Sequence, residues 1–165
     1  AATCRDAQAP PDPLYQELFQ VLKPTEVEVS RQGRVTVVTF PADHLFGSDE
    51  VSLRTEARMT LDMMSTALKL HPDYRIEVEG HTDDRGVPRE LRDRYGDPFV
   101  FSAARAYTLV EALADSSGVE RKRFAVIGRG PNAPIAGNDT DAGRRQNRRV
   151  VMYLHPPVGP APSSP

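Results

Sequence analysis

Residues 75–79, Arg-Ile-Glu-Val-Glu, alternate between polar and apolar side chains, and a glycine and then a carboxylate follow them. Such alternation is typical of a strand that buries one face. Gly80 ends this strand, Asp83 lies just past it, and residues 102–106, Ser-Ala-Ala-Arg-Ala, then begin a helical pattern. Because a helix that follows a strand usually packs back onto the same sheet, this order predicts a sheet covered by helices.

The rest of the chain repeats this change between extended and helical patterns. Ser52 and Ser102 are expected to cap two of the helices, and Gly118 is expected to end the second of these. The expected fold class is therefore α/β, an α+β sandwich with a mixed sheet of about four strands and helices packed on one face. Helical patterns cover residues 14–22, 53–68 and 102–115, extended patterns cover 27–29, 35–38, 75–79, 124–127 and 150–153, and loops are expected over 41–51, 81–100 and 128–146.

The folded domain is expected to span residues 14–154, with its core over 34–154. Residues 1–13 and 155–165 are rich in proline, so we expect a flexible N-terminal segment and a disordered tail. Cys4 is the single cysteine, which excludes an internal disulfide. It is either a lipid-modified cysteine, as in bacterial lipoproteins after signal cleavage, or an incidental thiol.

The charge of the chain excludes several classes of partner. The net charge is only −2, so no overall field attracts nucleic acid or an acidic membrane surface. The arginines within residues 144–149 form a basic cluster, but no aromatic side chains for base stacking accompany them. No apolar run approaches the ~20 residues that a membrane helix needs. Membrane attachment is therefore expected only through an anchor that the given sequence does not contain, because it was removed or never included.

Asp83 and Arg105 are the candidate binding pair. If Ser102 is the N-cap, Arg105 lies in the first helical turn, where the helix dipole disfavours a cation by ~0.3–1 kcal/mol. A carboxylate should therefore face it, from Asp83 or from a ligand. An arginine grips a carboxylate through two parallel hydrogen bonds and an aspartate accepts from an ammonium, so the pair suits an amino acid head group. The alternative is a structural salt bridge between Asp83 and Arg105 that pins the loop to the helix.

A set of motifs occurs in a fixed order along the chain. The motifs are Gly80-His-Thr-Asp-Asp-Arg-Gly86, Phe101-Ser-Ala-Ala-Arg-Ala106, Gly128-Arg-Gly130, Gly143-Arg144 and Asn147-Arg-Arg-Val150. Together they resemble the OmpA-like C-terminal domain over residues 34–154. This family includes the peptidoglycan-associated lipoprotein and the periplasmic part of the flagellar stator protein MotB. The resemblance implies a Gram-negative cell-envelope protein of the periplasm that binds peptidoglycan without covalent bonds, and that is tethered to the outer membrane if it is a lipoprotein.

The resemblance also implies which residues contact the ligand. In the family, the residues that match Asp83 and Arg105 hold the diaminopimelate of the peptide stem. Seven further residues are implied to belong to the site. Two come from the same motifs as Asp83 and Arg105, and three contribute backbone groups from the loop after the first core strand. The other two are adjacent arginines, one of which is expected to support the rim. These expected ligand-binding residues are Thr82, Ser102, Asp43, His44, Leu45, Arg148 and Arg149.

The chain departs from the family pattern in places. An asparagine that often lies seven positions before the motif arginine is Pro98 here, and a leucine is replaced by Phe101. Residues 87–97 form a highly charged insertion, which is either a contact surface for glycan or a partner, or simply solvated. These departures bear on affinity more than on the position of the site. They motivate an alternative function, a structural or assembly module of a stator-like or secretion-system-like envelope machine, homodimeric or bound to an envelope protein, with weak or no wall binding.

No catalytic, metal or cofactor site is expected. His44 and His81 do not combine with Asp83 and Asp84 in the spacing of a metal motif. The two adjacent aspartates should point to opposite sides, whereas a glycosidase needs two carboxylates that face each other at ~5–9.5 Å. The chain is therefore expected to be a binding protein and not an enzyme.

Overall fold

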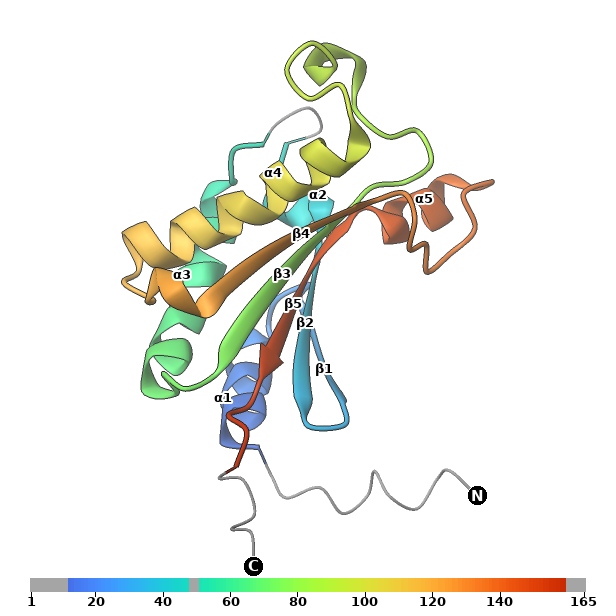
Figure 1. The fold of residues 1–165 in the computed structure, drawn as a ribbon. Coiled ribbons are helices and arrows are strands. Elements are labelled where there is room, and N and C mark those ends of the chain that lie inside the picture. Colours follow the sequence, from blue (N-terminus) through green and yellow to red (C-terminus); the bar gives the residue numbers. More distant parts are fainter. Residues whose placement is uncertain (1–11, 48–50, 160–165) are drawn as a thin grey trace, which may run out of the picture.

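One mixed five-stranded sheet organises the computed structural model, which describes residues 12–47 and 51–159 (Figure 1). The strand order is β1-β2-β5-β3-β4, in which β3 and β4 are parallel and the other neighbours antiparallel. The predicted fold class is confirmed, with five strands in the sheet instead of about four. The strands are β1 (Glu28–Gln32), β2 (Val35–Pro41), β3 (Arg75–His81), β4 (Phe124–Gly130) and β5 (Arg149–His155).

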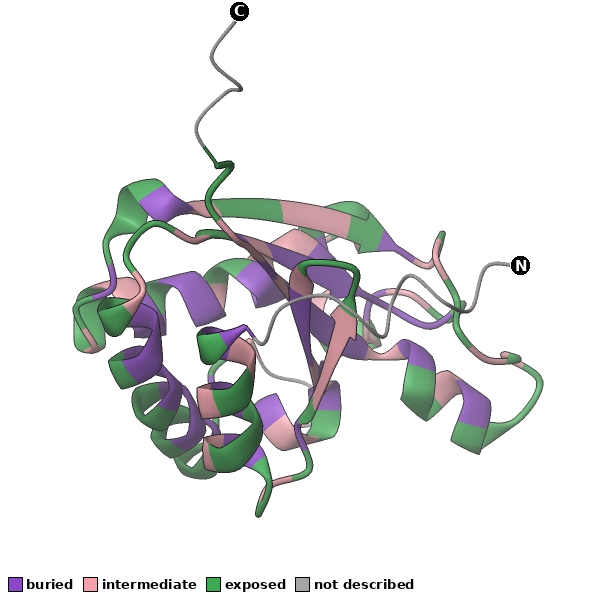
Figure 2. Ribbon diagram, turned by 90° about the horizontal axis from the view of Figure 1, so that it is seen from below, coloured by how far each residue is buried: buried purple, intermediate pink, exposed green. Residues whose placement is uncertain are grey.

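Three longer helices cover one face of the sheet, and two short ones lie near one end of it (Figure 1). A π-helical turn, Ala112–Ser116, directly extends α4 (Pro98–Glu111) in the connection between β3 and β4. The long helices bury the side that faces the sheet and expose the other (Figure 2). The helices are α1 (Pro13–Leu22), α2 (Ala42–Leu45), α3 (Thr55–Leu70), α4 (Pro98–Glu111) and α5 (Asp141–Asn147), and 3₁₀ turns occur at Arg89–Leu91 and Arg121–Arg123.

The hydrophobic core lies between the sheet and the three long helices. Alternation along each strand sends every second side chain into this layer, and the register aligns Ile76 with Leu154 and Val78 with Met152. The helices supply leucines and a methionine at intervals of three and four residues, as an amphipathic helix requires. Fully buried members of this core include Leu14, Leu18, Leu22, Phe40, Leu61, Met64, Leu68, Ile76, Leu109 and Met152.

Glycines let α4 approach the sheet closely. A Cβ atom on Gly80 would lie 1.9 Å from the carbonyl oxygen of Ser102, and one on Gly128 would lie 2.3 Å from that of Phe99. Both obstacles are backbone atoms, so only glycine fits at these two positions. The Ser102 hydroxyl meanwhile accepts a hydrogen bond from the Gly130 amide over 3.0 Å and links the helix to the end of β4.

Two predicted helix starts are wrong. Helix α4 begins at Pro98, four residues before Ser102, because Asp97 caps it and accepts from the Phe99 amide over 2.7 Å. Proline at the first helical position fits there, since that residue needs no intrahelical donor. Helix α3 begins at Thr55, and Arg54 takes the position expected for Ser52 without a side-chain capping bond.

Other predictions differ from the structure or lie outside it. The expected loop 128–146 contains most of α5, and the expected loop 41–51 contains α2. The cysteine at position 4, nearly all of the expected flexible segment 1–13 and the last part of the expected tail 155–165 fall outside the described residues. Within the described part of the tail, residues 156–159 belong to no helix or strand.

Candidate functional site

Asp83 lies just past the carboxyl end of β3, where its carboxylate has two partners. Oδ1 accepts from the Arg85 amide over 3.0 Å and holds the chain in a tight turn. Oδ2 accepts from Nη1 of Arg148 over 2.7 Å. The residue is only 4% exposed, so its charge is held in a sheltered position at the sheet edge.

Of the two arginines expected at the rim, Arg148 is the one that faces Asp83. Arg149 opens β5 next to the core residue Val150, so strand alternation turns its side chain to the face of the sheet opposite the long helices. There its guanidinium donates to the carbonyl oxygens of Asn147 and Ala133 over 3.1 and 3.0 Å. Burial lowers the pKa of Arg149.

A cavity of about 360 Å³ opens beside Asp83. Three separate parts of the chain form it: the start of α2, the turn that follows β3, and the residue just before β5. Its walls are mostly charged, with more arginines than aspartates. The lining residues are Asp43 and Asp83, the arginines Arg85, Arg89, Arg92 and Arg148, and Gly86, Val87 and Pro88 between them.

Arg105 lies two turns into α4, because the helix starts earlier than expected. It is therefore not opposed by the helix dipole, which acts within the first turn, and the electrostatic reason for expecting a carboxylate there does not apply. The side chain is 7% exposed, and its guanidinium carbon lies 4.8 Å from the centre of the Phe46 ring and 4.4 Å from that of Phe101. Two aromatic faces thus stabilise the cation.

The expected salt bridge between Asp83 and Arg105 is not the pair that holds the loop after β3. Among the residues that the structure describes, the arginine that forms an ion pair with Asp83 is Arg148, from the other side of the cavity. Asp83 and Arg105 nevertheless belong to neighbouring segments, because α4 packs directly over β3.

The remaining expected site residues have different surroundings. Asp43 lines the cavity and accepts from Nε of Arg145 over 2.6 Å. His44 turns instead toward α3, where Nε2 lies 3.3 Å from the Thr60 hydroxyl, and Leu45 is fully buried in the core. Their side chains therefore do not face the cavity, which leaves only backbone groups for the contact expected of this loop.

Two motif residues have structural roles on the strand side of the site. The amide of Thr82 donates to the Gly130 carbonyl over 2.9 Å and extends the pairing of β3 with β4. Ser102 is fully buried and connects α4 to β4, as described above. Both residues therefore position the segments that carry Asp83 and Arg105.

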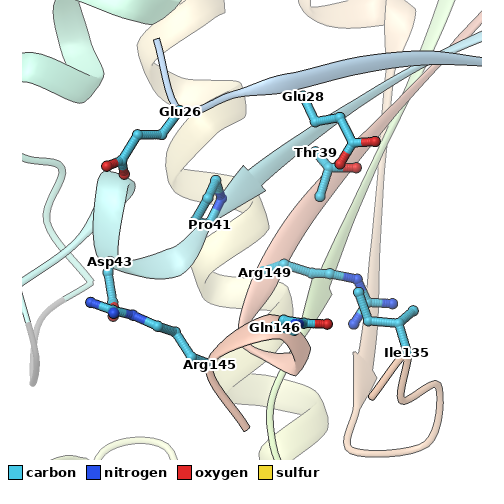
Figure 3. A pocket seen from close by; sticks show the side chains of 9 residues that line it. All are labelled: Glu26, Glu28, Thr39, Pro41, Asp43, Ile135, Arg145, Gln146 and Arg149. Carbon is cyan, nitrogen blue, oxygen red and sulfur yellow. The ribbon is translucent and has the colours of Figure 1, made fainter. Parts of the chain in front are cut away.

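A second cavity, of about 470 Å³, lies on the sheet face opposite the long helices. Figure 3 shows Arg149 reaching toward Ile135 on one side of it, and Arg145 against Asp43 on the other. Asp43 lines both cavities, so its ion pair with Arg145 lies between them. Arg149 thus belongs to this second cavity and not to the one beside Asp83.

Sequence reasoning missed the role of Asn147. Its amide oxygen accepts from the amides of Ile135 and Ala136 over 2.8 and 3.0 Å, and its Nδ2 donates to the Ala136 carbonyl over 2.9 Å. These bonds fix the loop before α5 and thereby the position of Arg148. The signal was present as the first residue of the motif 147–150, but its partners lie too far along the chain to be read from the pattern.

Neither a metal site nor a membrane helix is found in the described parts of the chain. Within residues 12–47 and 51–159, no group of three or more His, Cys, Asp or Glu side chains is arranged to hold a metal ion. None of the helices in these ranges has the length and apolar composition needed to span a bilayer.

Residues 45–148 match the family model described as the OmpA family. The chain belongs to the OmpA family. Among solved structures of this fold, the cell wall anchor of the T6SS from Pseudomonas aeruginosa superposes with a TM-score of 0.73 at 30% identity, and the match covers 87% of this chain and 96% of that one.

Curated relatives also match this member of the OmpA family. The Probable lipoprotein YiaD of Escherichia coli (strain K12) is 33% identical over 140 residues, which cover 85% of this chain and 60% of that protein. The Peptidoglycan-associated lipoprotein of Agrobacterium fabrum is 38% identical over 109 residues, which cover 66% of this chain and 57% of that protein. The chain therefore spans somewhat more than half the length of these two relatives.

Proposed function

We propose that this chain binds peptidoglycan without covalent bonds in the periplasm and so anchors an envelope protein or complex to the cell wall. The observation that carries the proposal is the sheltered carboxylate of Asp83 on the wall of a charged cavity at the sheet edge. Membership of the OmpA family and the likeness to a cell wall anchor of known structure support it. The role is recognition and not catalysis.

The ligand group is the amino acid head group of diaminopimelate in the peptide stem. Asp83 accepts from its ammonium, and Arg105 binds its carboxylate. Arg148 takes part as a neighbour, because one of its nitrogens already contacts Asp83 while its side chain is still 35% exposed and free to shift as the ammonium arrives. A charge-assisted hydrogen bond contributes ~1.5–3 kcal/mol, so loss of either partner should weaken binding by about 10- to 100-fold.

Two variants with matched controls test this function. Asp83→Asn keeps the acceptor for the Arg85 amide but removes the charge, and Arg105→Lys keeps the charge but loses the two-pronged contact. Asp115→Asn and Arg121→Lys make the same exchanges in an exposed ion pair of 2.7 Å beyond the end of α4. Pull-down with purified peptidoglycan should fall strongly for the first two variants and stay at the wild-type level for the controls.

Titration with free diaminopimelate locates the site directly. Amide NMR shifts should cluster at residues 82–84, 102–105 and 43–46. Wild-type retention of Asp83→Asn on peptidoglycan would refute the role given to Asp83.

A second candidate function is an assembly module that binds an envelope partner and has little affinity for the wall. The observation that favours it is that Asp83 already has two partners, the Arg85 amide and the Arg148 guanidinium, without any ligand. A chain of this kind would show no NMR shifts with diaminopimelate at concentrations that saturate an OmpA-family wall binder.

A further inference from the structure

The cavity beside Asp83 holds an excess of positive charge. Its two aspartates are each already paired with an arginine, Asp43 with Arg145 over 2.6 Å and Asp83 with Arg148 over 2.7 Å. The negative charge of this wall is therefore largely compensated before a ligand enters. The remaining charged groups of the lining are all cationic.

These cations are Arg85, Arg89 and Arg92, which follow one another in the turn and the 3₁₀ segment after β3. Within residues 12–47 and 51–159, none of the three forms an ion pair with a carboxylate. Arg92 uses Nε to donate to the Val87 carbonyl over 3.2 Å, and the residue lines the cavity. All three side chains are exposed, so a ligand can reach them.

The positive charge of these arginines affects the titration of a nearby carboxyl group. The Arg144 guanidinium holds the pKa of Asp141 below its usual range, and Arg85 and Arg148 act on it in the same direction. Arg85 and Arg148, from segments far apart in the sequence, therefore act on the same region beside the cavity. An anion that enters it meets several guanidinium groups at once.

The segment that carries these arginines is held in place. Gly86 adopts a φ of +69°, and a Cβ atom there would lie 3.1 Å from Cγ of Pro98 at the start of α4. Val87 is buried, and the Gly86 amide donates to the Asp83 carbonyl over 3.3 Å. The turn that orients the carboxylate of Asp83 therefore also holds in place the backbone that carries the three arginines.

We propose that Arg85, Arg89 and Arg92 form a second subsite, which binds a free carboxylate of the peptide stem next to the diaminopimelate head group. This inference rests on the proposed function, because the same cavity is shared by Asp83 and the three arginines. A guanidinium recognises a carboxylate through two hydrogen bonds, and an amide in the same place offers neither the charge nor two acceptor oxygens. The chain therefore selects stem peptides whose carboxylate is free over those in which it is amidated.

Calorimetric titration with two synthetic peptides tests the subsite. Both contain L-alanine, γ-linked D-glutamate and diaminopimelate, and they differ only in whether the α-carboxyl group of the glutamate is free or amidated. We expect the wild-type chain to prefer the free acid by about tenfold, the value of one good charge-assisted contact. The preference should shrink as salt is added, since these arginines are exposed.

A double variant and a matched control assign the preference to this wall. Arg85→Gln/Arg89→Gln should bind both peptides equally, while its affinity for free diaminopimelate stays within about twofold of wild type, the scatter expected when no direct contact is lost. Arg94→Gln/Arg121→Gln removes the same charge from positions outside the cavity, one on the same segment, and should keep the preference.

The outcomes separate the two proposals. Equal affinity of the wild-type chain for the two peptides, with diaminopimelate still bound, would refute the carboxylate subsite and leave the proposed function intact. Loss of the preference in the control variant as well would also refute it, since the effect would then come from overall charge. If neither peptide nor diaminopimelate binds, the proposed function fails and this inference fails with it.

Discussion

Arg148 donates from Nη1 to Oδ2 of Asp83 over 2.7 Å, although the two residues are 65 positions apart in the chain. One comes just before β5 and the other just after β3, so antiparallel pairing of these two strands brings them together. The side chain of Asp83 is 5% exposed and that of Arg148 is 35% exposed, so the pair is sheltered at Asp83 and open to the cavity at Arg148.

This geometry predicts that the pair contributes to stability. Arg148→Gln and Asp83→Asn should each lower the free energy of unfolding, and the double variant should lose less than their sum, with a coupling of ~1–2 kcal/mol. Urea denaturation of the four proteins gives the coupling. The same cycle at Arg121 and Asp115, which are 50% and 60% exposed, should give a coupling near zero. Additive losses at Arg148 and Asp83 would show that the pair is not a stabilising contact.

Replacement of Arg123 should cost more stability than replacement of Arg148 or Asp83. Its guanidinium donates to the carbonyl oxygens of Leu68, His71 and Tyr74 over 2.7, 2.7 and 2.9 Å, and so satisfies carbonyl groups at and just beyond the end of α3. Burial lowers the pKa of Arg123, and at 8% exposure water offers little replacement for these bonds.

Arg123→Met should therefore lower the free energy of unfolding by ~2–4 kcal/mol, because buried carbonyl groups lose a charged donor. Arg121→Met, two positions earlier in the same 3₁₀ turn, removes an exposed arginine and should change it by less than ~0.5 kcal/mol. Equal midpoints for the two variants in urea denaturation would contradict the role of Arg123.

The close contact at Gly80 predicts that no larger residue is tolerated there. In Gly80→Ala the new methyl group would meet the backbone of Ser102 at 1.9 Å, so α4 would have to move away from β3. We expect a loss of about 3 kcal/mol or more, at the upper end of overpacking effects. In contrast, Gly33→Ala adds a methyl group in open space at a φ of +60° and should lose only ~1–2 kcal/mol. Thermal unfolding followed by circular dichroism compares the two.

Local sequence patterns predicted most of the fold. The strands β1 and β2 with the turn at Gly33, the strand β3 and the helix α3 all carry the period of their own secondary structure. Helix α5 was missed because Asp141–Asn147 has one alanine and no larger apolar side chain, so it shows no amphipathic period. The early start of α4 was missed although Asp97-Pro98 is a cap followed by a first-turn proline.

The candidate site was predictable only in part. The position of Asp83 follows from the strand that precedes it, since the end of a strand can be read from the alternation. Its pairing with Arg148, and the three carbonyl partners of Arg123, connect segments 49 to 65 positions apart and have no local signature. The sequence could have decided between Arg148 and Arg149 as the partner of Asp83. Val150 is a core residue, so strand alternation turns the side chain of Arg149 to the other face of the sheet.

The buried position of His81 predicts that the protein loses stability in mild acid. The residue is 5% exposed, on the sheet face opposite the long helices, and within the described parts of the chain neither ring nitrogen has a hydrogen-bond partner of good geometry. Burial, followed by the charge of Arg149, lowers its pKa to about 4, although Glu79 with an oxygen 3.4 Å from Nε2 acts in the opposite direction and Arg129 adds to the lowering.

The sign follows from the two pKa values. In the unfolded chain the pKa of histidine is about 6.5, so between about pH 6.5 and about pH 4 the unfolded state binds a proton that the folded state does not. The free energy of unfolding is therefore unaffected by this group above about pH 6.5 and falls as the pH is lowered toward 4, by up to ~3 kcal/mol. Because carboxylates also titrate in this range, the wild-type curve alone does not isolate His81.

His81→Asn isolates it. The variant removes the titrating group, so its free energy of unfolding should fall less steeply than that of the wild type between about pH 6.5 and about pH 4.5. His155→Asn replaces a histidine at the end of β5 whose side chain is 29% exposed, and should leave the wild-type slope in place. Urea denaturation across this range measures the slopes. Equal slopes for wild type and His81→Asn would mean that the imidazole is protonated as readily in the folded chain as in the unfolded one, against the burial that the structure gives it.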